Sequence, residues 1–154
     1  MIDKWHIRFM RLTREISTWS KDPSKKIGAL IVNEDRRILA SGYNGFPKGI
    51  KDDERLDNKE IKYSLVIHAE LNALLNALNN GVSVKDSTMY VYGLPICDNC
   101  AKTIIQAGIK NLIISYPHDL TNSWADIWEE KSKPMFSEAK TNFLFLDPRD
   151  LDTV

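Results

Sequence analysis

The sequence contains few residues of the kinds that form disulfides and metal sites, with two cysteines and three histidines among 154 residues. The cysteines, Cys97 and Cys100, lie one helical turn apart. Charged residues run through the first 19 positions, so the N-terminus does not resemble an export signal. In such a chain, this cysteine spacing favours metal ligation or redox chemistry over a structural disulfide. We therefore expect an intracellular protein, located in the cytoplasm.

The sequence also lacks an excess of either charge and any long hydrophobic run. Lys plus Arg and Asp plus Glu both number 21, and the pI is about 6.8. This balance gives no electrostatic basis for nucleic-acid binding as the main role. No apolar run approaches the roughly 20 residues of a membrane span, so we expect no membrane association. The length and the 43% hydrophobic content predict one globular domain over 1–154, with residues 148–154 as a tail.

Apolar runs and turn residues alternate in an order typical of an α/β protein. We expect a first helix over 5–20, followed by a β-hairpin with strands at 27–32 and 38–42. Residues 51–62 are strongly charged and are expected to form a solvated insertion. The remaining elements are expected as helices over 65–78, 97–107 and 121–139, and strands over 88–92, 111–116 and 142–146. This order predicts an α/β/α sandwich with a mixed five-stranded sheet and helices on both faces.

Two short stretches carry the chemistry: His68-Ala69-Glu70, and Cys97-Asp98-Asn99-Cys100 after 26 intervening residues. Each stretch is expected at or near a helix start, where the helix dipole stabilises thiolates. Two thiolates and one imidazole are ligands that Zn²⁺ prefers, and three protein ligands leave the fourth position open, as in catalytic zinc sites. Glu70 is then free to act as a proton carrier beside the metal.

Other interpretations of these residues remain open from the sequence alone. The cysteines also fit a redox pair, and a structural zinc site completed by His6 or His118 is a second alternative. Glu70 argues against the structural site, because a purely structural metal does not need a carboxylate beside it.

At these residues the chain resembles the zinc-dependent nucleotide deaminases, whose signature is H-x-E followed by P-C-x-x-C. The resemblance is specific to deoxycytidylate (dCMP) deaminases and covers about residues 17–116. It is carried, in the same order, by Lys21-Asp22-Pro23, residues 27–32, residues 42–49, residues 67–73 and residues 100–110. The signature has proline directly before the first cysteine, whereas this chain has Ile96 there and Pro95 one position earlier.

The resemblance implies the cytidine deaminase-like fold and hydrolysis of the 4-amino group of a cytosine deoxynucleotide, giving dUMP and ammonia. A zinc-activated water would attack C4, with Glu70 as the proton shuttle. Asn44 would hydrogen-bond the substrate, the Ala69 backbone would contact the pyrimidine carbonyl, and Tyr116 would pack near the base. Asn44 equally fits a turn residue and Tyr116 equally fits the core.

The resemblance also implies a phosphate site, effectors and assembly. Four basic residues lie in loops expected to border the site: Lys25, Lys26, Lys48 and Arg55. Lys26 is the candidate ligand for the phosphate. Gly42, Tyr43 and Gly45 form a candidate effector loop for dCTP or dTTP, and a homo-oligomer, either a hexamer or a dimer, is expected. Alternatives are the same chemistry on CMP, modified dCMP, cytidine or tRNA adenosine, and a non-catalytic zinc-stabilised binding module.

Overall fold

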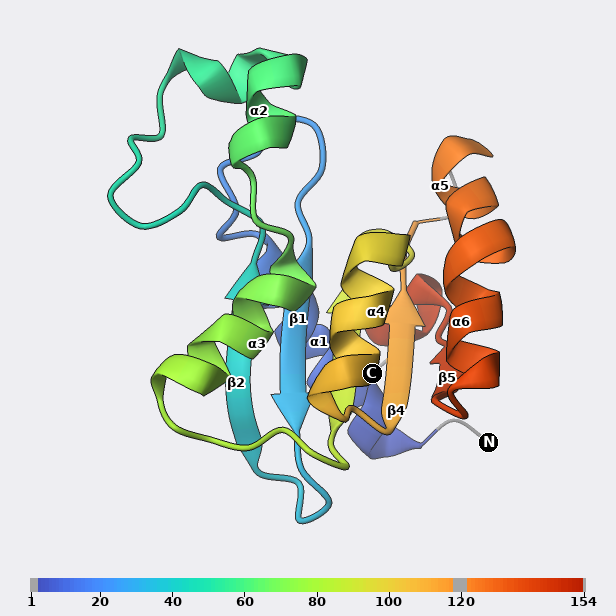
Figure 1. Cartoon of the computed structure of the whole chain (residues 1–154). Helices are drawn as coiled ribbons and strands as arrows, with labels where there is room; N and C mark the ends of the chain where they lie inside the picture. The colour runs from blue at the N-terminus through green and yellow to red at the C-terminus, as the bar shows by residue number, and fades with distance from the viewer. Residues whose placement is uncertain (1–2, 118–121, 154) are drawn as a thin grey trace.

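A five-stranded mixed sheet forms the centre of the protein (Figure 1). The computed structural model describes residues 3–117 and 122–153. The strands are β1 (Gly28–Val32), β2 (Ile38–Tyr43), β3 (Thr88–Tyr92), β4 (Asn111–Ser115) and β5 (Asn142–Phe145), in the order β2-β1-β3-β4-β5. β1 is antiparallel to β2 and β3, whereas β3, β4 and β5 are parallel. The predicted mixed sheet with an N-terminal hairpin is confirmed.

Helices cover both faces of this sheet. One face packs against α1 (Lys4–Ser17) and the short η3 (Pro148–Asp152). The opposite face packs against α3 (Ala69–Asn79), α4 (Asp98–Ala107) and the C-terminal helical segments. Those segments are α5 (Asn122–Ile127), the π-helix η2 (Trp128–Ser132) and α6 (Lys133–Glu138).

The alternation of side chains along β1 explains why both faces are covered. Ala29 and Ile31 belong to the core under α3 and α4, whereas Leu30 and Val32 belong to the core under α1. Successive side chains of a strand point to opposite faces, so a fully buried run such as β1 requires helices on both sides.

A glycine sets how closely α3 approaches the sheet. A Cβ atom on Gly42 would lie 2.4 Å from the backbone N of Ala73 and 2.6 Å from the backbone O of Ala69. Only glycine fits there, so the backbone of α3 lies directly on β2. This contact places the start of α3, and with it His68 and Glu70, at one end of the sheet.

The structure corrects the expectation for residues 51–62. Instead of a wholly solvated insertion, this part contains η1 (Glu54–Asp57) and most of α2 (Lys59–Leu65). The side chain of Lys62 is buried and forms an ion pair with Asp22. The chain is extended at Val66 and α3 begins only at Ala69, so the helix predicted from residue 65 starts four residues later, and residue 65 instead ends the separate helix α2.

The C-terminal residues also differ from the expected tail. η3 packs on α1, with Leu151 buried in the core between them. The Arg11 guanidinium donates a hydrogen bond to the backbone O of Leu151 at 2.6 Å. These contacts tie the end of the chain to the first helix.

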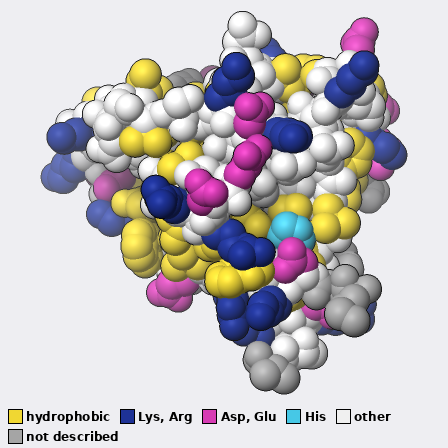
Figure 2. Space-filling view, turned by 90° about the horizontal axis from the view of Figure 1, so that it is seen from below, with side chains coloured by type: hydrophobic (Ala, Val, Ile, Leu, Met, Phe, Trp, Pro, Cys, Tyr) yellow, Lys and Arg dark blue, Asp and Glu magenta, His cyan; other side chains and the backbone are white. Residues whose placement is uncertain are grey.

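The surface shows no single-sign expanse in the view of Figure 2, where positive and negative side chains are mixed around apolar ones. This agrees with the neutral composition. Within the described residues, none of the helices combines the length and the apolar character needed to cross a membrane.

Candidate active site

The site lies where two helices begin. His68 is the N-cap residue of α3, and Cys97 is the N-cap residue of α4. Glu70 and Cys100 follow within the first turns of the same helices. The positive ends of both helix dipoles therefore meet at one place, which favours thiolate and carboxylate groups there.

A backbone bridge fixes the approach to His68. The Gly45 N–H donates to the Ile67 carbonyl at 3.1 Å, and the Ile67 N–H donates to the Gly45 carbonyl at 2.8 Å. Because Ile67 directly precedes His68, the loop after β2 and the start of α3 are held together. Gly45 thus has a structural role beside the site.

Three donor atoms converge on a single point. His68 Nδ1 lies 3.4 Å from Cys97 Sγ and 3.3 Å from Cys100 Sγ. Two atoms bound to one tetrahedral zinc at ordinary Zn–S and Zn–N distances are about 3.6 Å apart. Among the described residues, this trio is the one group of three or more His, Cys, Asp or Glu side chains close enough to share a metal ion. The donor set and the spacing fit Zn²⁺.

Hydrogen bonds among these side chains shift the pKa values of all three. The hydrogen bond from Cys100 lowers the pKa of Cys97 to about 4, and the His68 ring adds to this effect. The same hydrogen bond raises the pKa of Cys100. His68 has a raised pKa, mainly because of its hydrogen bond with Cys97. The three ligands share protons that a divalent cation would replace on binding.

Glu70 is a buried carboxyl group that faces the same space. Its side chain is only 4% exposed, yet it lines the cavity beside His68 and Cys97. Burial raises the pKa of Glu70, while the nearby His68 opposes that shift. A carboxyl group with a raised pKa holds a proton more readily than a free one, which suits it to general acid and base roles.

A cavity of about 400 Å³ opens in front of the metal ligands. This volume lies within the ordinary range of small-molecule sites. Its inner end contains His68, Glu70 and Cys97, together with Leu94 and Pro95 from the loop before α4. Pro95 thus reaches the cavity, while Ile96, at the position where the signature has proline, is fully buried in the core.

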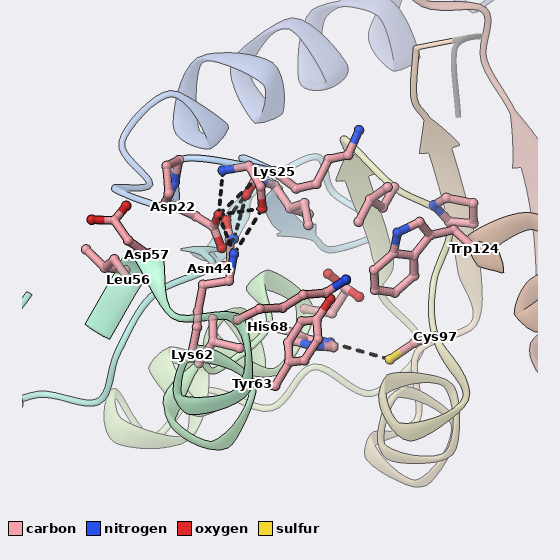
Figure 3. Close-up of a pocket in the computed structure, with 18 residues that line it drawn as sticks. Asp22, Lys25, Asn44, Leu56, Asp57, Lys62, Tyr63, His68, Cys97 and Trp124 are labelled. Carbon is pink, nitrogen blue, oxygen red and sulfur yellow. Dashed lines mark hydrogen bonds and ion pairs between the residues drawn. The ribbon is translucent and has the colours of Figure 1, made fainter. Parts of the chain in front are cut away.

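A hydrogen-bonded network forms one wall of the cavity (Figure 3). Asp22 Oδ1 accepts hydrogen bonds from the N–H groups of Ser24 and Lys25 and from Lys62 Nζ, the last at 3.1 Å. Burial alone would raise the pKa of Asp22, but these hydrogen bonds hold it below its ordinary value. Lys62 therefore joins α2 to the loop that precedes β1.

Asn44 belongs to this wall, as predicted, and its side chain is already engaged. Its Oδ1 accepts from the Ile27 N–H at 2.9 Å, and its Nδ2 donates to the Lys25 carbonyl at 2.9 Å. Asn44 is 3% exposed and lines the cavity. The structure places it where it shapes the loop, and a role in substrate binding remains a prediction.

Other predicted residues lie outside the cavity lining. Tyr116 packs edge-on against Phe145 at 5.8 Å between ring centroids, as in the core alternative. Lys26 Nζ donates to the backbone O of Ser20. Ala69 is fully buried at the start of α3.

The effector-loop candidates have structural contacts of their own. Gly42 lies under α3, and Tyr43, 40% exposed, packs edge-on against Trp19. A structural zinc site completed by His6 is not supported. His6 Nδ1 lies 2.8 Å from the hydroxyl of Tyr90, which belongs to the core under α1 on the opposite face of the sheet. His118 lies outside the described residues.

The sequence interpretation missed several residues that line the cavity. Lys59, Lys62 and Tyr63 come from α2, and Trp124 comes from α5. The charged stretch gave no local signal for the α2 residues, because the buried residue of α2 is Lys62 and the apolar Ile61 is exposed.

Comparison with known proteins agrees with this geometry. The sequence model of the family described as "Cytidine and deoxycytidylate deaminase zinc-binding region" matches residues 3–116. The chain belongs to this family. The resemblance found in the sequence is confirmed, and Zn²⁺ is the metal of this deaminase site.

Curated relatives match either nearly the whole chain or about seven tenths of it. A protein of Aliivibrio fischeri named "Uncharacterized deaminase in luxG 3'region" is 38% identical over 98% of this chain and 99% of its own length. Human deoxycytidylate deaminase is 45% identical over 71% of this chain, which spans only 64% of the human protein.

A solved structure supports the fold of this deaminase. The dCMP deaminase of cyanophage S-TIM5, in complex with dCMP and dUMP, superposes with a TM-score of 0.75 at 24% identity, over 95% of this chain and 99% of that one. The predicted cytidine deaminase-like fold is confirmed.

Proposed function

We propose that this protein hydrolyses dCMP to dUMP and ammonia. The observation that carries the proposal is that Glu70 lines the same cavity as His68 and Cys97, two of the three converging metal ligands. The relatives named deoxycytidylate deaminases support the choice of dCMP.

In the proposed reaction, three residues bind the metal and Glu70 transfers the protons. His68, Cys97 and Cys100 hold the metal. Zinc, when bound in such a site, supplies a Lewis acid that lowers the pKa of water. Glu70 accepts a proton from the attacking water and delivers it to N3 of the pyrimidine. It then carries the second proton to the amino nitrogen, which leaves C4 as ammonia, so water is consumed and the C4 carbonyl of dUMP remains.

We propose that the 5′-phosphate lies at the outer end of the cavity. Lys25 and Lys59 line the cavity, and no side chain among the described residues pairs with either ammonium group, although Lys59 lies over the Tyr63 ring. Lys62 also lines the cavity, but its charge is neutralised by Asp22. Free ammonium groups are suited to a phosphate dianion. These lysines replace Lys26 as the preferred phosphate ligands.

The decisive experiment measures ammonia release from the zinc-loaded protein with dCMP, CMP, deoxycytidine and an adenosine-containing tRNA stem-loop. We expect the highest kcat/KM with dCMP. Absence of turnover with dCMP, alongside turnover of another substrate, would refute the proposed substrate and retain the deaminase chemistry.

The remaining expectations concern assembly, regulation and location. We propose a homo-oligomer, a hexamer or a dimer, because Ile38, Leu75 and Leu78 are exposed apolar residues on the adjacent β2 and α3. Light scattering of the purified protein tests this directly. Control by dCTP or dTTP and a cytoplasmic location stay predictions from the sequence.

A further inference from the structure

Two tryptophans on the same helical segment have different surroundings. Trp128 is 4% exposed, and its ring contacts Phe136, Phe143 and Phe145 at 5.2–5.9 Å between centroids. Trp124, one turn earlier, is only partly buried, and among the described residues it has no aromatic ring partner. Trp128 therefore fills the core, whereas packing does not account for Trp124.

Trp124 lines the cavity instead (Figure 3). Its indole points toward the space in front of His68 and lies on the side of Cys97 in this view. Tyr63 of α2 also presents its ring to the cavity, and 55% of this residue is exposed. The cavity thus has two aromatic side chains in its lining, contributed by segments far apart in the sequence.

Trp124 lies in a part of the sequence that the family match does not include. The family match ends at residue 116, and it includes the metal ligands and Glu70. Trp124 comes from α5, beyond that match. One wall of the cavity is therefore supplied by a part of the chain that the family description does not cover.

We propose that Trp124 is a substrate-binding residue that stacks on the pyrimidine ring of the bound nucleotide. This inference rests on the proposed deamination, which requires C4 of the base to lie beside Glu70 and the metal ligands. The flat ring then occupies the inner end of the cavity, where the indole of Trp124 is directed. Stacking of a base on an aromatic side chain is favourable for any base and does not need hydrogen bonds.

Fluorescence with dUMP, the proposed product, tests the contact without turnover. We expect dUMP to quench the tryptophan emission of the zinc-loaded protein, and Trp124→Phe to lose most of this signal. Trp19→Phe is the matched control, because Trp19 is 56% exposed and lies outside the cavity lining. If Trp124→Phe keeps the full quench, the stacking contact is refuted.

Kinetics separates this inference from the proposed function. We expect Trp124→Ala to lower kcat/KM for dCMP about tenfold, mainly through KM, and Trp124→Phe to retain most of it. Normal dCMP turnover by Trp124→Ala, within twofold of the unchanged protein, would overturn the role of Trp124 and leave the deaminase function intact. An unchanged protein that neither turns over dCMP nor binds dUMP would overturn the proposed function itself.

Discussion

The two ends of the cavity are built from different kinds of structure. At the inner end, His68, Glu70 and Cys97 lie at the starts of helices that pack directly on the sheet. At the outer end, Lys59 and Tyr63 stand on a seven-residue helix, and both are exposed. The inner end is therefore held by the core, while the outer end is held by a few polar contacts.

This difference separates the residues that carry out the reaction from the residues that select the substrate. The positions of the metal ligands depend on close backbone packing, such as that of α3 on Gly42. The outer wall depends on the Asp22–Lys62 pair, which ties α2 to the loop before β1. Changes at the outer end are expected to alter which substrate binds without altering the reaction, whereas changes to the metal ligands or Glu70 are expected to alter the reaction itself.

The largest effect is expected for Glu70→Gln at the inner end. Glutamine keeps the shape of the side chain but cannot carry the proton, so kcat for dCMP should fall about 10²–10⁴-fold. Zinc content, measured by elemental analysis, should stay at the level of the unchanged protein, because Glu70 is not one of the three converging ligands.

Glu15→Gln is the matched control for this variant, since Glu15 is exposed on α1 at the opposite face of the sheet. It should keep full activity. Retained turnover in Glu70→Gln would exclude the proton-shuttle role, and loss of zinc from that variant would assign Glu70 to metal binding instead.

The second prediction concerns the buried Asp22–Lys62 ion pair, which joins α2 to the loop before β1. Lys62→Met leaves the buried Asp22 carboxylate without its ammonium partner, which should lower the free energy of unfolding by about 3 kcal/mol. Chemical denaturation of the zinc-loaded protein measures this change. We expect KM for dCMP to rise more than kcat falls, because α2 is then less firmly held while the metal end is unchanged.

A surface ion pair provides the control for Lys62→Met. Lys21 contacts Asp52 at 3.1 Å, but the Lys21 side chain is 70% exposed. Lys21→Met should therefore cost less than about 1 kcal/mol. Equal losses in the two lysine variants would contradict the view that the buried pair holds the outer wall.

The same division explains what the sequence revealed of the site. His68, Glu70, Cys97 and Cys100 were predicted because their side-chain types and helix-start positions are local features required by zinc chemistry. The alternation of buried strands and helices likewise predicted the sheet and its layers.

Other residues depend on partners that local patterns do not reveal. Lys62 lies in a charged stretch, and only its contact with Asp22, 40 residues earlier, shows that it is buried. Tyr116 fitted either a contact with the base or the core, and the structure shows its ring packed against Phe145 on the neighbouring strand. Trp124 and Trp128 lie one turn apart in the same helical segment. Only the tertiary structure shows that Trp124 lines the cavity and Trp128 lies in the core.

The third prediction tests the outer end directly. Lys25→Ala and Lys59→Ala should each lower kcat/KM for dCMP about tenfold, since each removes a charge-assisted contact to the phosphate. The same variants should leave the activity on deoxycytidine unchanged, because this nucleoside lacks the phosphate. Lys48→Ala is the control, as Lys48 is exposed and lies outside the cavity lining. An equal loss on both substrates would mean that these lysines act on the structure of the site.

The smallest effect is expected from the titration of Asp22. Its pKa is below the ordinary value of 3.8, because hydrogen bonds to the carboxylate outweigh the effect of burial. The unfolded chain therefore binds a proton at a higher pH than the folded protein does. The stabilisation by Asp22 is fully present above about pH 4 and is lost as the pH falls through the folded-state pKa. We expect the difference in unfolding free energy between the unchanged protein and Asp22→Asn to be constant from pH 7 to pH 5 and to shrink below pH 4. A difference that stays constant to pH 2 would show that Asp22 acts by its shape and hydrogen bonds rather than by its charge.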